Sequence, residues 1–570
     1  MKLNGATALV RALEDLGVKH IFGLPGVQNS QVYDALLDSP IEHVLVRHEQ
    51  AAVHMADGYA RATGGTGVVL VTSGPGATNT VTGIATAYMD SVPVVVITGQ
   101  VPTTAMGTDA FQEADITTIT LPITKHSYLL GNVDELVPSV FEAFYLASSG
   151  RPGPVLIDIP LNVAAGQALY KRPAAKPSLP SYKPTIKGNA RQVKAAAELI
   201  VSAAKPVLLA GGGVVSSGAS EALVSLAEQN GIPVVSTLLA KGAIASDHPL
   251  YGGQPGVYGT IAANTLLQEA DVVIAVGTKF SERITGNATE FAPQAQIIHI
   301  DIDPAEIGKN IRVDIPIVGD ANVVLAALLE RLGTCGASAG RITGKKDKQS
   351  CSSPAPDNTT HQVFSVLNQL LSERQQESDV IITTDVGQHQ LWASHLIDVD
   401  IPRRFLTSGG LGTMGFGLPA ALGAQLAYPE ALVLCISGDG SFQMNLQEMA
   451  TAIAQKLPIK VAIINNESLG LVRQYQELFL GQRVTQTHLE ALPNYVRLAG
   501  AYGWQGKSLC LGKLDQGSNN QADDSSIKEA FSWLIESVGP ALLEIVVPTE
   551  DLLTPFVKPG GSLLEVVEGA

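Results

Sequence analysis

An aspartate flanked by two glycines, Asp439, follows directly on an apolar run that reads LVLCIS. The next apolar run, KVAIINN, ends in a pair of asparagines, Asn465 and Asn466. If the two runs are neighbouring parallel strands, about 4.8 Å apart, Asp439 and Asn466 converge at one sheet edge. A carboxylate, an amide oxygen and a backbone carbonyl form half of the octahedral oxygen shell of Mg²⁺, which phosphate oxygens and water usually complete.

The glycines and the helix that follows favour a phosphate at this turn. Glycine lets the backbone approach a phosphate closely, and the first turn of a helix offers amide donors to an anion. The sequence has no GxxxxGK[ST] motif, which excludes a nucleotide P-loop. A GDG turn is also an ordinary feature of α/β proteins, and the asparagine pair is what favours a diphosphate anchored through a metal.

The elements around this turn form a strand, a crossover helix and a second strand. After Gly438, helical spacing predicts one helix whose apolar face carries Phe442, Leu446, Met449, Ala450 and Ile453. We expect that face to pack on the sheet. The two parallel strands then finish at the same edge.

Short apolar runs alternate with helical segments along the whole chain. Runs such as GVVLVTSG, PVVVITG, PVLLAGGG, DVVIAVG and IIHIDID lack period-two alternation, which is typical of strands buried on both faces of a parallel sheet. Two stretches rich in Pro, Gly, Ser and Lys are typical of linkers, 170–190 and 333–361. We therefore predict an α/β protein with three doubly wound parallel-sheet domains, at 1–170, 190–335 and 360–550.

Two segments of the chain resemble each other. Residues 72–99 and 407–438 both run from a Thr-Ser-Gly turn through a small-residue helix into a buried strand, which suggests a duplication. A polar stretch at 514–526 is typical of a surface loop within the third domain.

The composition fits a compact protein of several domains. The chain has 570 residues, of which 45% are hydrophobic and 16% charged. The net charge of -16 is spread without long like-charge runs, which argues against nucleic acid and anionic membrane as partners. No apolar run is long enough to span a bilayer, and the chain starts directly with an amphipathic helix, so we expect no leader peptide. The cysteines show no metal spacing and indicate a reducing, cytoplasmic location; they are Cys335, Cys351, Cys435 and Cys510.

The GDG turn and the NN pair occur together with several longer motifs. These are RHEQAAVHMADGYARATG, TSGPGATN, GTDAFQEAD, PITKH, SGRPGPVLIDIP, IDIDPAEIGKN, DVGQHQLW and TSGGLGTMGFGLPAA. With them, nearly the whole chain apart from the linkers resembles the catalytic subunit of the acetohydroxyacid (acetolactate) synthases, which depend on thiamin diphosphate. The resemblance implies that the three domains bind, in chain order, the thiamin pyrimidine ring, FAD, and the thiamin diphosphate with Mg²⁺.

The resemblance also implies a reaction. Family members decarboxylate pyruvate to a hydroxyethyl carbanion on the cofactor and add it to a second 2-oxoacid, pyruvate or 2-oxobutyrate, in branched-chain amino acid biosynthesis. Glu49 matches the glutamate that hydrogen-bonds the pyrimidine ring and drives its amino group toward the imine that acts as base. Phe111, Gln112 and Lys125 match positions lining the substrate pocket, where Lys125 would place positive charge near a carboxylate. Without the resemblance, Glu49 would be paired with a neighbouring Arg or His, and Lys125 would be a solvated surface lysine.

Other family positions imply the cofactor and metal ligands. Met414 would wedge beneath the cofactor and bend it, while Asp439, Asn466 and the backbone carbonyl of Ser468 would hold Mg²⁺. Further cofactor contacts are implied for Gly412, Gln388, His389, Gly438, Gly440 and Ser441. Because Glu49 lies in the first domain and the GDG turn in the third, family precedent places them on different subunits of a homodimer or a dimer of dimers. A separate regulatory subunit is a further partner that the resemblance allows.

The middle domain resembles a flavin-binding domain. Its VLLAGGGVV is not a full GxGxxG, and the carboxylates that end IIHIDID are of a kind that meets ribose hydroxyls. The resemblance implies that this domain binds FAD, which in the family does no net redox work. The residues implied in FAD binding are Arg151, Gly211, Gly213, Thr237, Leu238, Gly277, Arg283, Asp301 and Asp303.

Several positions depart from the family pattern. Val27 and Gln28 stand where the family has Gly-Ala, which puts a larger polar side chain near the reacting centre and leaves the acceptor open. Tyr475 replaces a tryptophan associated with preference for 2-oxobutyrate, Leu471 a methionine, and Leu161 a lysine at the channel mouth. Around the expected flavin the substituted residues are Tyr258, Lys279, Ser281 and Glu282, so FAD retention is also open.

Three other functions compete with acetolactate synthesis. They are another thiamin diphosphate carboligase or 2-oxoacid decarboxylase, a flavin-dependent pyruvate oxidase, and a non-catalytic paralogue. Glu49, Asp439 and Asn466 are all present, which argues against the last. The motifs IDIDPAEIGKN and GTDAFQEAD belong to the biosynthetic branch and argue against a catabolic, FAD-free enzyme. Acceptor preference, feedback inhibition, the need for a regulatory subunit and assembly beyond a dimer stay open.

Overall fold

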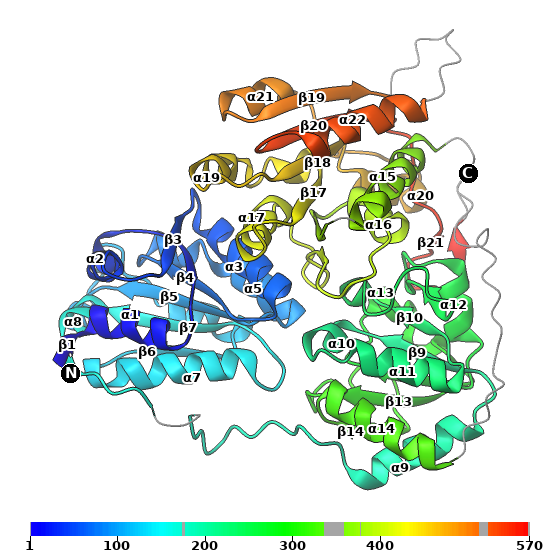
Figure 1. Cartoon of the computed structure of the whole chain (residues 1–570), viewed down its shortest axis with the longest axis horizontal. Helices are drawn as coiled ribbons and strands as arrows, with labels where there is room; N and C mark the ends of the chain where they lie inside the picture. The colour runs from blue at the N-terminus through cyan, green and yellow to red at the C-terminus, as the bar shows by residue number, and fades with distance from the viewer. Residues whose placement is uncertain (1, 174–176, 336–357, 377, 512–522, 568–570) are drawn as a thin grey trace.

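The computed structural model describes residues 2–173, 177–335, 358–376, 378–511 and 523–567. Its elements form three bodies, each built on a six-stranded parallel sheet covered by helices (Figure 1). In Figure 1 the N-terminal body runs from blue to cyan, the central body from teal to green, and the C-terminal body from yellow-green to red. The prediction of three doubly wound parallel-sheet units is confirmed.

The N-terminal sheet has the strand order β3-β2-β4-β5-β7-β6. Its strands are β2 (His20–Leu24), β3 (Glu42–Leu45), β4 (Gly67–Val71), β5 (Val94–Gln100), β6 (His126–Leu129) and β7 (Val155–Pro160). The helices are α1 (Gly5–Asp15), α2 (Ser30–Leu36), α3 (Glu49–Thr63), α4 (Pro75–Thr78), α5 (Val81–Asp90), α6 (Ile116–Thr120), α7 (Leu136–Ser148) and α8 (Leu161–Ala165). β4 and β5 are buried along their whole length because both faces carry β-branched residues under helices. A short antiparallel pair, β1 (Lys2–Asn4) with β8 (Gln167–Leu169), closes this body.

The central sheet has the order β11-β10-β9-β12-β13-β14. Its strands are β9 (Pro206–Ala210), β10 (Val234–Ser236), β11 (Tyr251–Gly253), β12 (Val272–Val276), β13 (Gln296–Asp301) and β14 (Ile315–Val318). Its helices are α9 (Ala190–Ser202), α10 (Gly212–Ser216), α11 (Ser220–Asn230), α12 (Ile261–Gln268), α13 (Glu282–Thr285) and α14 (Ala321–Cys335).

The C-terminal sheet has the order β16-β15-β17-β18-β20-β19. Its strands are β15 (Val380–Thr384), β16 (Phe405–Leu406), β17 (Leu432–Gly438), β18 (Lys460–Asn465), β19 (Gln505–Cys510) and β20 (Ala541–Val546). Its helices are α15 (Thr359–Gln375), α16 (Gln388–Leu396), α17 (Gly417–Ala427), α18 (Asp439–Phe442), α19 (Met449–Ala454), α20 (Gly470–Phe479), α21 (Tyr495–Ala501) and α22 (Asp524–Glu536).

The N-terminal and C-terminal sheets share one topology. When the strands of each sheet are renumbered from one along the chain, both sheets read 2-1-3-4-6-5. β4 therefore corresponds to β17, and β3 to β16. The shared topology supports a duplication, but it pairs the two segments differently from the sequence resemblance. Residues 407–438 end in β17, whereas residues 72–99 end in β5, and β5 corresponds to β18. The alignment expected from the Thr-Ser-Gly turns is wrong by one strand, because the first turn follows β4 whereas the second follows β16, which corresponds to β3.

Helices α3 and α17 lie side by side and join these two bodies (Figure 1). A Cβ on Gly58 of α3 would lie 2.3 Å from the carbonyl oxygen of Ala420, and one on Gly423 of α17 would lie 2.0 Å from that of Met55. Each glycine thus faces the residue three positions before the other glycine. The backbones touch reciprocally, as two halves related by a pseudo-twofold axis would.

The chain that follows β20 returns to the central body. The Val557 amide donates to the Val257 carbonyl at 2.9 Å, and Asn264 Nδ2 donates to the Leu563 carbonyl at 3.2 Å. This segment holds the antiparallel pair β21 (Phe556–Val557) and β22 (Val566–Val567). The domain boundaries at 170, 190, 335, 360 and 550 stay predictions. Most of the expected linker at 333–361 and of the expected loop at 514–526 lies outside the described residues.

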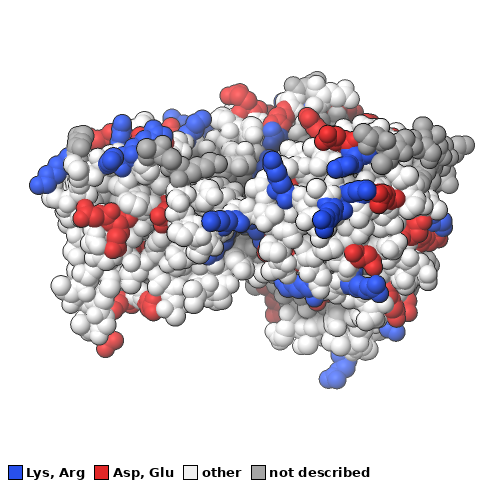
Figure 2. Space-filling model, turned by 90° about the horizontal axis from the view of Figure 1, so that it is seen from below, with Lys and Arg blue, Asp and Glu red and all other residues white. Residues whose placement is uncertain are grey.

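Within the described ranges, no helix is both long and apolar enough to cross a membrane. Lysines and arginines lie interspersed with aspartates and glutamates over the face drawn in Figure 2. Of the four cysteines, Cys435 is buried and Cys510 exposed, and both are free thiols.

Candidate active site and cofactor cavity

The Asp439 turn lies where two neighbouring strands end. β17 and β18 pair in parallel, with Gly438 opposite Ile464. Asp439 opens α18, Asn466 follows β18 directly, and both are buried. Ser441 Oγ accepts a hydrogen bond from the Gly438 amide at 3.1 Å, which tightens the turn. The two side chains expected to share a metal thus lie at adjoining strand ends.

The Asp439 carboxylate is short of partners. Its Oδ1 accepts from the Gly440 amide at 3.0 Å, whereas its Oδ2 is buried with no hydrogen-bond partner. Burial raises the pKa of Asp439 to about 7, although nearby backbone amides, including that of Ser468, act to lower it. A cation beside Oδ2 would restore the charged carboxylate. This oxygen therefore fits a metal ligand.

The backbone turns sharply just after Asn466. Glu467 has φ of 56°, in the left-handed region that non-glycine residues rarely adopt. The Ser468 amide donates to Asn466 Oδ1 at 3.2 Å, and Asn466 Nδ2 donates to Gln388 Oε1 at 3.1 Å. Strained turns of this kind gather at ligand sites, and this one holds Asn466 and Ser468 close to the Asp439 turn.

The helix predicted after Gly438 is broken into three short pieces. They are α18, a 3-10 turn at Leu446–Glu448 and α19. Asn445 interrupts the helix, with φ of -139° and a side chain that donates to the Gly415 carbonyl at 2.7 Å. Ile453, expected on the apolar face, is 39% exposed. The prediction of one continuous helix is wrong because this bond to a distant loop holds Asn445 outside helical geometry.

Met414 and His389 lie against the same turn. A Cβ on Gly438 would lie 2.8 Å from His389 Nδ1, and one on Gly440 would lie 3.8 Å from Met414 Cε. His389 Nε2 is buried without a partner, and burial lowers the pKa of this imidazole to about 3. The neutral ring therefore has one nitrogen free for a ligand. The structure thus brings two of the predicted cofactor residues, Met414 and His389, against the GDG turn.

Glu49 begins α3 and is buried. Its Oε2 accepts from Asn79 Nδ2 at 2.9 Å, and a Cβ on Gly76 would lie 3.4 Å from its Oε1. Its neighbours are engaged elsewhere: Arg47 donates to backbone carbonyls, and His48 Nδ1 caps α3. The carboxylate is therefore held by the TSGPGATN motif of its own body.

Phe111 and Gln112 lie at the surface beside that motif. Phe111 is 83% exposed, and Gln112 has φ of 62°. A Cβ on Gly74 would lie 2.8 Å from the Gln112 carbonyl oxygen, so the loop packs directly on the Gly74 turn.

Lys125 does not share this surface. Its Nζ donates to the carbonyl of Leu146, to that of Ser149 at 2.7 Å and to Tyr182 Oη at 3.1 Å. Burial lowers the pKa of Lys125 to about 8. The two carbonyls belong to the last turn of α7 and to its C-cap residue Ser149, so the ammonium caps that helix. It is not a solvated surface lysine, and its role in lining the substrate pocket stays a prediction.

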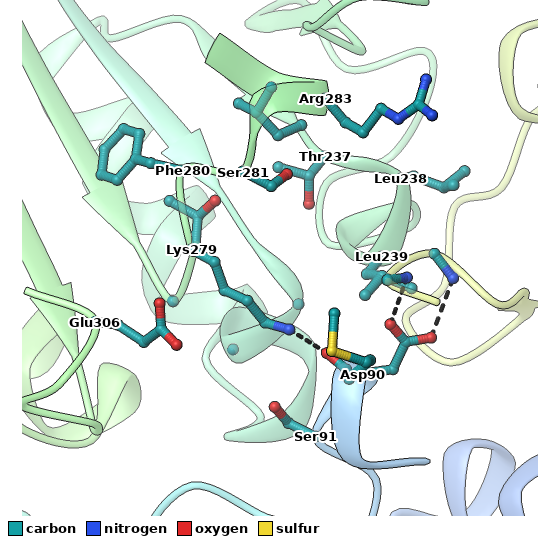
Figure 3. Close-up of a pocket in the computed structure, with 18 of the residues that line it drawn as sticks. Asp90, Ser91, Thr237, Leu238, Leu239, Lys279, Phe280, Ser281, Arg283 and Glu306 are labelled. Atoms are coloured by element: carbon teal, nitrogen blue, oxygen red, sulfur yellow. Dashed lines mark hydrogen bonds between the residues drawn. The ribbon is translucent and has the colours of Figure 1, made fainter. Parts of the chain in front are cut away.

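A cavity of about 890 Å³ opens where the three bodies meet (Figure 3). Predicted flavin and cofactor residues that line it are Arg151, Gly213, Thr237, Leu238, Gly277, Arg283, Asp301 and Gly412. The substituted positions Tyr258, Lys279, Ser281 and Glu282 line it too. Its size is that of a site for a large cofactor.

Gly211, Gly213 and Gly277 form the close backbone contact at one wall of the cavity. A Cβ on Gly211 would lie 2.1 Å from the Gly277 carbonyl oxygen, and one on Gly213 would lie 2.6 Å from Gly277 Cα. Gly277 itself has φ of 59°. Gly211 therefore serves packing between the ends of β9 and β12, and only the other two border the cavity.

Carboxylates border another wall of the cavity. Arg151 Nη1 lies 3.1 Å from Asp303 Oδ2 and 2.7 Å from Glu306 Oε1. The second oxygen of Glu306 is buried without a partner, and burial raises the pKa of Asp301 to about 6. Acceptors of this kind suit the hydroxyl groups of a dinucleotide. Asp303 is set back behind Arg151 rather than lining the space.

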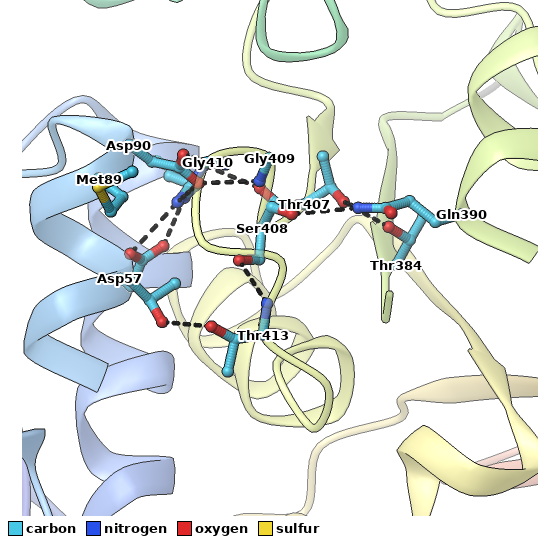
Figure 4. A network of polar contacts seen from close by, with 12 residues as sticks. Asp57, Met89, Asp90, Thr384, Gln390, Thr407, Ser408, Gly409, Gly410 and Thr413 are labelled. Atoms are coloured by element: carbon cyan, nitrogen blue, oxygen red, sulfur yellow. Dashed lines mark hydrogen bonds and ion pairs between the residues drawn. The ribbon is translucent and has the colours of Figure 1, made fainter. Parts of the chain in front are cut away.

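Asp90 borders the cavity and belongs to no motif, whereas Glu306 borders it from within the motif IDIDPAEIGKN. Figure 4 shows Asp90 facing the Gly409–Gly410 turn of the C-terminal body. In the sequence Asp90 ends an amphipathic helix, where an acidic residue usually faces solvent, so no local signal could have found it. Among the described residues, no group of three or more His, Cys, Asp and Glu side chains is placed to hold a metal. The Asp439 site supplies one carboxylate and would need other oxygen ligands.

Three family models match the chain. The N-terminal TPP binding domain of thiamine pyrophosphate enzymes matches residues 3–119, the central domain matches 193–328 and the C-terminal TPP binding domain matches 385–545. Each match lies on one of the three sheets.

Curated relatives match over most of their length. A probable acetolactate synthase large subunit of Methanocaldococcus jannaschii is 48% identical, over 99% of this chain and 95% of its own. An acetolactate synthase of Arthrospira platensis is 47% identical, over 98% and 96%. The acetolactate synthase isozyme 3 large subunit of Escherichia coli is 47% identical, over 88% and 89%.

Proposed function

The chain belongs to the thiamine pyrophosphate enzymes and, among them, to the acetolactate synthase family, and from this we propose that it makes 2-acetolactate in branched-chain amino acid biosynthesis. The reaction decarboxylates pyruvate and joins the remaining two-carbon unit to a second 2-oxoacid. The observation that carries the proposal is the buried, unpartnered Oδ2 of Asp439 at the end of β17, beside the strained turn after Asn466.

Residues around the GDG turn fit thiamin diphosphate held through Mg²⁺. Asp439, Asn466 and the carbonyl of Ser468 would be the metal ligands, and His389 would offer its free nitrogen to the diphosphate. Met414 would support the cofactor from below. When bound, thiamin diphosphate supplies the electron sink for decarboxylation of a 2-oxoacid. The protein positions it and excludes water.

Glu49 would hold a proton at the pyrimidine nitrogen. Burial and the bond from Asn79 fix the direction of its carboxylate. We propose that it serves the GDG turn of a partner protomer, so that a homodimer carries two equivalent sites. The 83% exposure of Phe111, beside the Gly74 turn, supports a surface that a second copy covers. A dimer of dimers would repeat this arrangement.

The central cavity fits FAD without a redox role. Its volume, its glycine wall and the acceptors Asp301 and Glu306 support a dinucleotide. Arg283 donates to Tyr258 Oη at 2.9 Å, so the substituted tyrosine gives this arginine a new partner at the rim.

The names of two of the relatives contain the words large subunit, which supports a separate smaller, regulatory subunit for this chain. A cytoplasmic location stays a prediction from the cysteine usage.

A different acceptor is the second candidate, and Gln28 favours it. The Oε1 of Gln28 is buried without a partner, and the residue packs on Gly99 at the end of β5. A second 2-oxoacid with an alkyl side chain would leave this amide oxygen without a hydrogen bond, at a cost of about 1–3 kcal/mol. A second substrate whose side chain carries an N–H or O–H group could donate to it.

The test is to incubate the purified protein with pyruvate, with and without 2-oxobutyrate, and to identify the products. Thiamin diphosphate, Mg²⁺ and FAD are added singly and together. Acetolactate that requires thiamin diphosphate and Mg²⁺ is the expected product. Acetaldehyde alone would instead mean a simple decarboxylase, and bleaching of flavin by pyruvate without air would mean an oxidase.

A further inference from the structure

Glu448 of the C-terminal body holds the loop that leads into Glu49. Its Oε1 accepts from the Arg47 amide at 2.9 Å and from the His48 amide at 3.1 Å. Its Oε2 accepts from Thr451 Oγ at 2.6 Å. The side chain is fully buried, and burial raises the pKa of Glu448 while these hydrogen bonds lower it. One carboxylate oxygen thus fixes two successive amides just before Glu49.

Asp90 of the N-terminal body does the same for the loop that leads into Met414. Its Oδ2 accepts from the Gly409 amide at 3.0 Å and its Oδ1 from the Gly410 amide at 2.7 Å (Figure 4). Arg61 Nη2 lies 2.8 Å from Oδ2, and the Asp90 side chain is fully buried. A Cβ on Gly410 would lie 2.6 Å from Oδ1, so only glycine admits the carboxylate this closely.

The two contacts are equivalent under the internal pseudo-twofold symmetry. Glu448 follows β17 and holds the loop after β3, whereas Asp90 follows β4 and holds the loop after β16. Since β4 corresponds to β17 and β3 to β16, each half uses a buried carboxylate to clamp the other half in the same place. The clamped loops lead into α3 and α17, the two helices whose glycines interlock.

We infer that Glu448 and Asp90 are a reciprocal pair of positioning residues, which set Glu49 and Met414 for the reaction without touching thiamin diphosphate. The inference rests on the proposed function, because it takes Glu49 and Met414 as the residues that activate thiamin diphosphate. Both loops reach across the interface between the same two bodies. The contact on each loop fixes how the two bodies sit relative to each other, and with them the directions of the Glu49 and Met414 side chains.

The geometry predicts different effects for the two conservative replacements. In Glu448→Gln the amide oxygen still accepts from both Arg47 and His48, and the new NH₂ faces Thr451 Oγ, which can accept. In Asp90→Asn one of the two oxygens becomes a donor, and it then faces a backbone amide or Arg61. Glu448→Gln should therefore keep its clamp, whereas Asp90→Asn should lose half of it.

The experiment measures deuterium exchange at the reactive thiazolium carbon of thiamin diphosphate by NMR, on the folded holoenzyme at saturating cofactor and Mg²⁺. We expect Glu448→Ala, Asp90→Ala and Asp90→Asn to slow exchange by about 10- to 100-fold, as a misplacement near 1 Å would. Glu448→Gln should stay within about threefold of wild type, and so should the control Thr451→Val, which spares Oε1.

The outcomes separate the inference from the proposed function. If wild type neither exchanges faster than free cofactor nor forms acetolactate, the proposed function fails. If wild type does both and the folded alanine variants exchange at the wild-type rate, the clamp is only structural and the inference is overturned. Should an alanine variant not fold, the contrast between Glu448→Gln and Asp90→Asn decides, and equal rates for these two would refute the inference.

Discussion

At the scale of single residues, Asp439 combines burial with a missing partner. Its sequence position between two glycines predicted a ligand role, and its unpartnered Oδ2 and raised pKa support that proposal independently. Burial also raises the pKa of Asp158 to about 7, but Asp158 accepts from Thr98 Oγ and Gln100 Nε2. The comparison separates a satisfied buried carboxylate from one that awaits a ligand.

Replacement of Asp439 by Asn should weaken the metal site. The variant keeps the side-chain shape but loses the charge, so the Mg²⁺ concentration needed for half-maximal activity should rise by about tenfold or more. A Mg²⁺ titration at fixed thiamin diphosphate measures this. Asp158→Asn is the matched control and should leave the titration unchanged. Equal titrations for wild type and Asp439→Asn would remove the carboxylate from the metal site.

Lys125 should matter for stability rather than for substrate. Lys125→Met leaves the Leu146 carbonyl without its lysine donor and leaves the Ser149 carbonyl with the Tyr182 hydroxyl as its side-chain donor, which should lower the free energy of unfolding by about 1–3 kcal/mol. Urea unfolding measures this loss. The KM for pyruvate should not change, and a raised KM with unchanged stability would restore Lys125 to the pocket.

At the scale of elements, α3 and α17 meet through glycines, and this interface also holds a buried histidine. His54 of α3 is fully buried beside Phe416, with ring centroids 5.4 Å apart. Burial lowers the pKa of His54 to about 3 from its ordinary 6.5. The interface is therefore built around a neutral imidazole.

Acid should weaken this interface. Below pH 6.5 His54 binds a proton in the unfolded chain, whereas in the folded chain it stays neutral down to about pH 3. The free energy of unfolding therefore falls as the pH falls from 6.5 towards 3. The loss is about 1.4 kcal/mol per pH unit, or about 2 kcal/mol at pH 5. Urea unfolding of wild type and His54→Gln at pH 7.5 and pH 5 checks it. The variant should lose less stability on acidification, and parallel losses would contradict the prediction.

The break after Phe442 shows why element boundaries near a site resist prediction. The apolar spacing through Met449 is genuine, but Asn445 bonds to Gly415 in a different loop. That partner is 30 residues away in sequence and adjacent only in the folded chain. The same break leaves Glu448 free to point at the N-terminal body.

At the scale of the whole molecule, the N-terminal and C-terminal bodies are two copies of one topology, related by a pseudo-twofold axis. In one chain, Glu49 belongs to one copy and Asp439 to the other. The central body adds a cavity that all three bodies line. The proposed homodimer would add a second, true twofold axis and complete each site across it.

Mixed dimers test the shared site. If Glu49 of one protomer serves Asp439 of its partner, a dimer of one Glu49→Gln chain and one Asp439→Asn chain has both defects in one site and an intact second site. At a Mg²⁺ concentration that saturates wild type but is too low for Asp439→Asn, random pairing of the two variants should then restore about a quarter of wild-type activity. Activity after joint unfolding and refolding measures this, with each variant refolded alone as the control. No recovery despite mixed dimers would place the site within one chain.

The sequence by itself determined the three parallel sheets, the family, and the turn at Asp439, because buried β-branched runs, glycines and strand-end polar residues leave local patterns. Through the family resemblance it also named residues that line the cavity, such as Arg151 and Thr237, whose role in binding FAD stays a prediction. Only the tertiary structure decided the contacts of Lys125, the break at Asn445 and the contacts of Glu448 and Asp90 across the interface. Each of these depends on backbone partners distant in sequence, and a local pattern cannot report which carbonyl or amide a side chain will meet after folding.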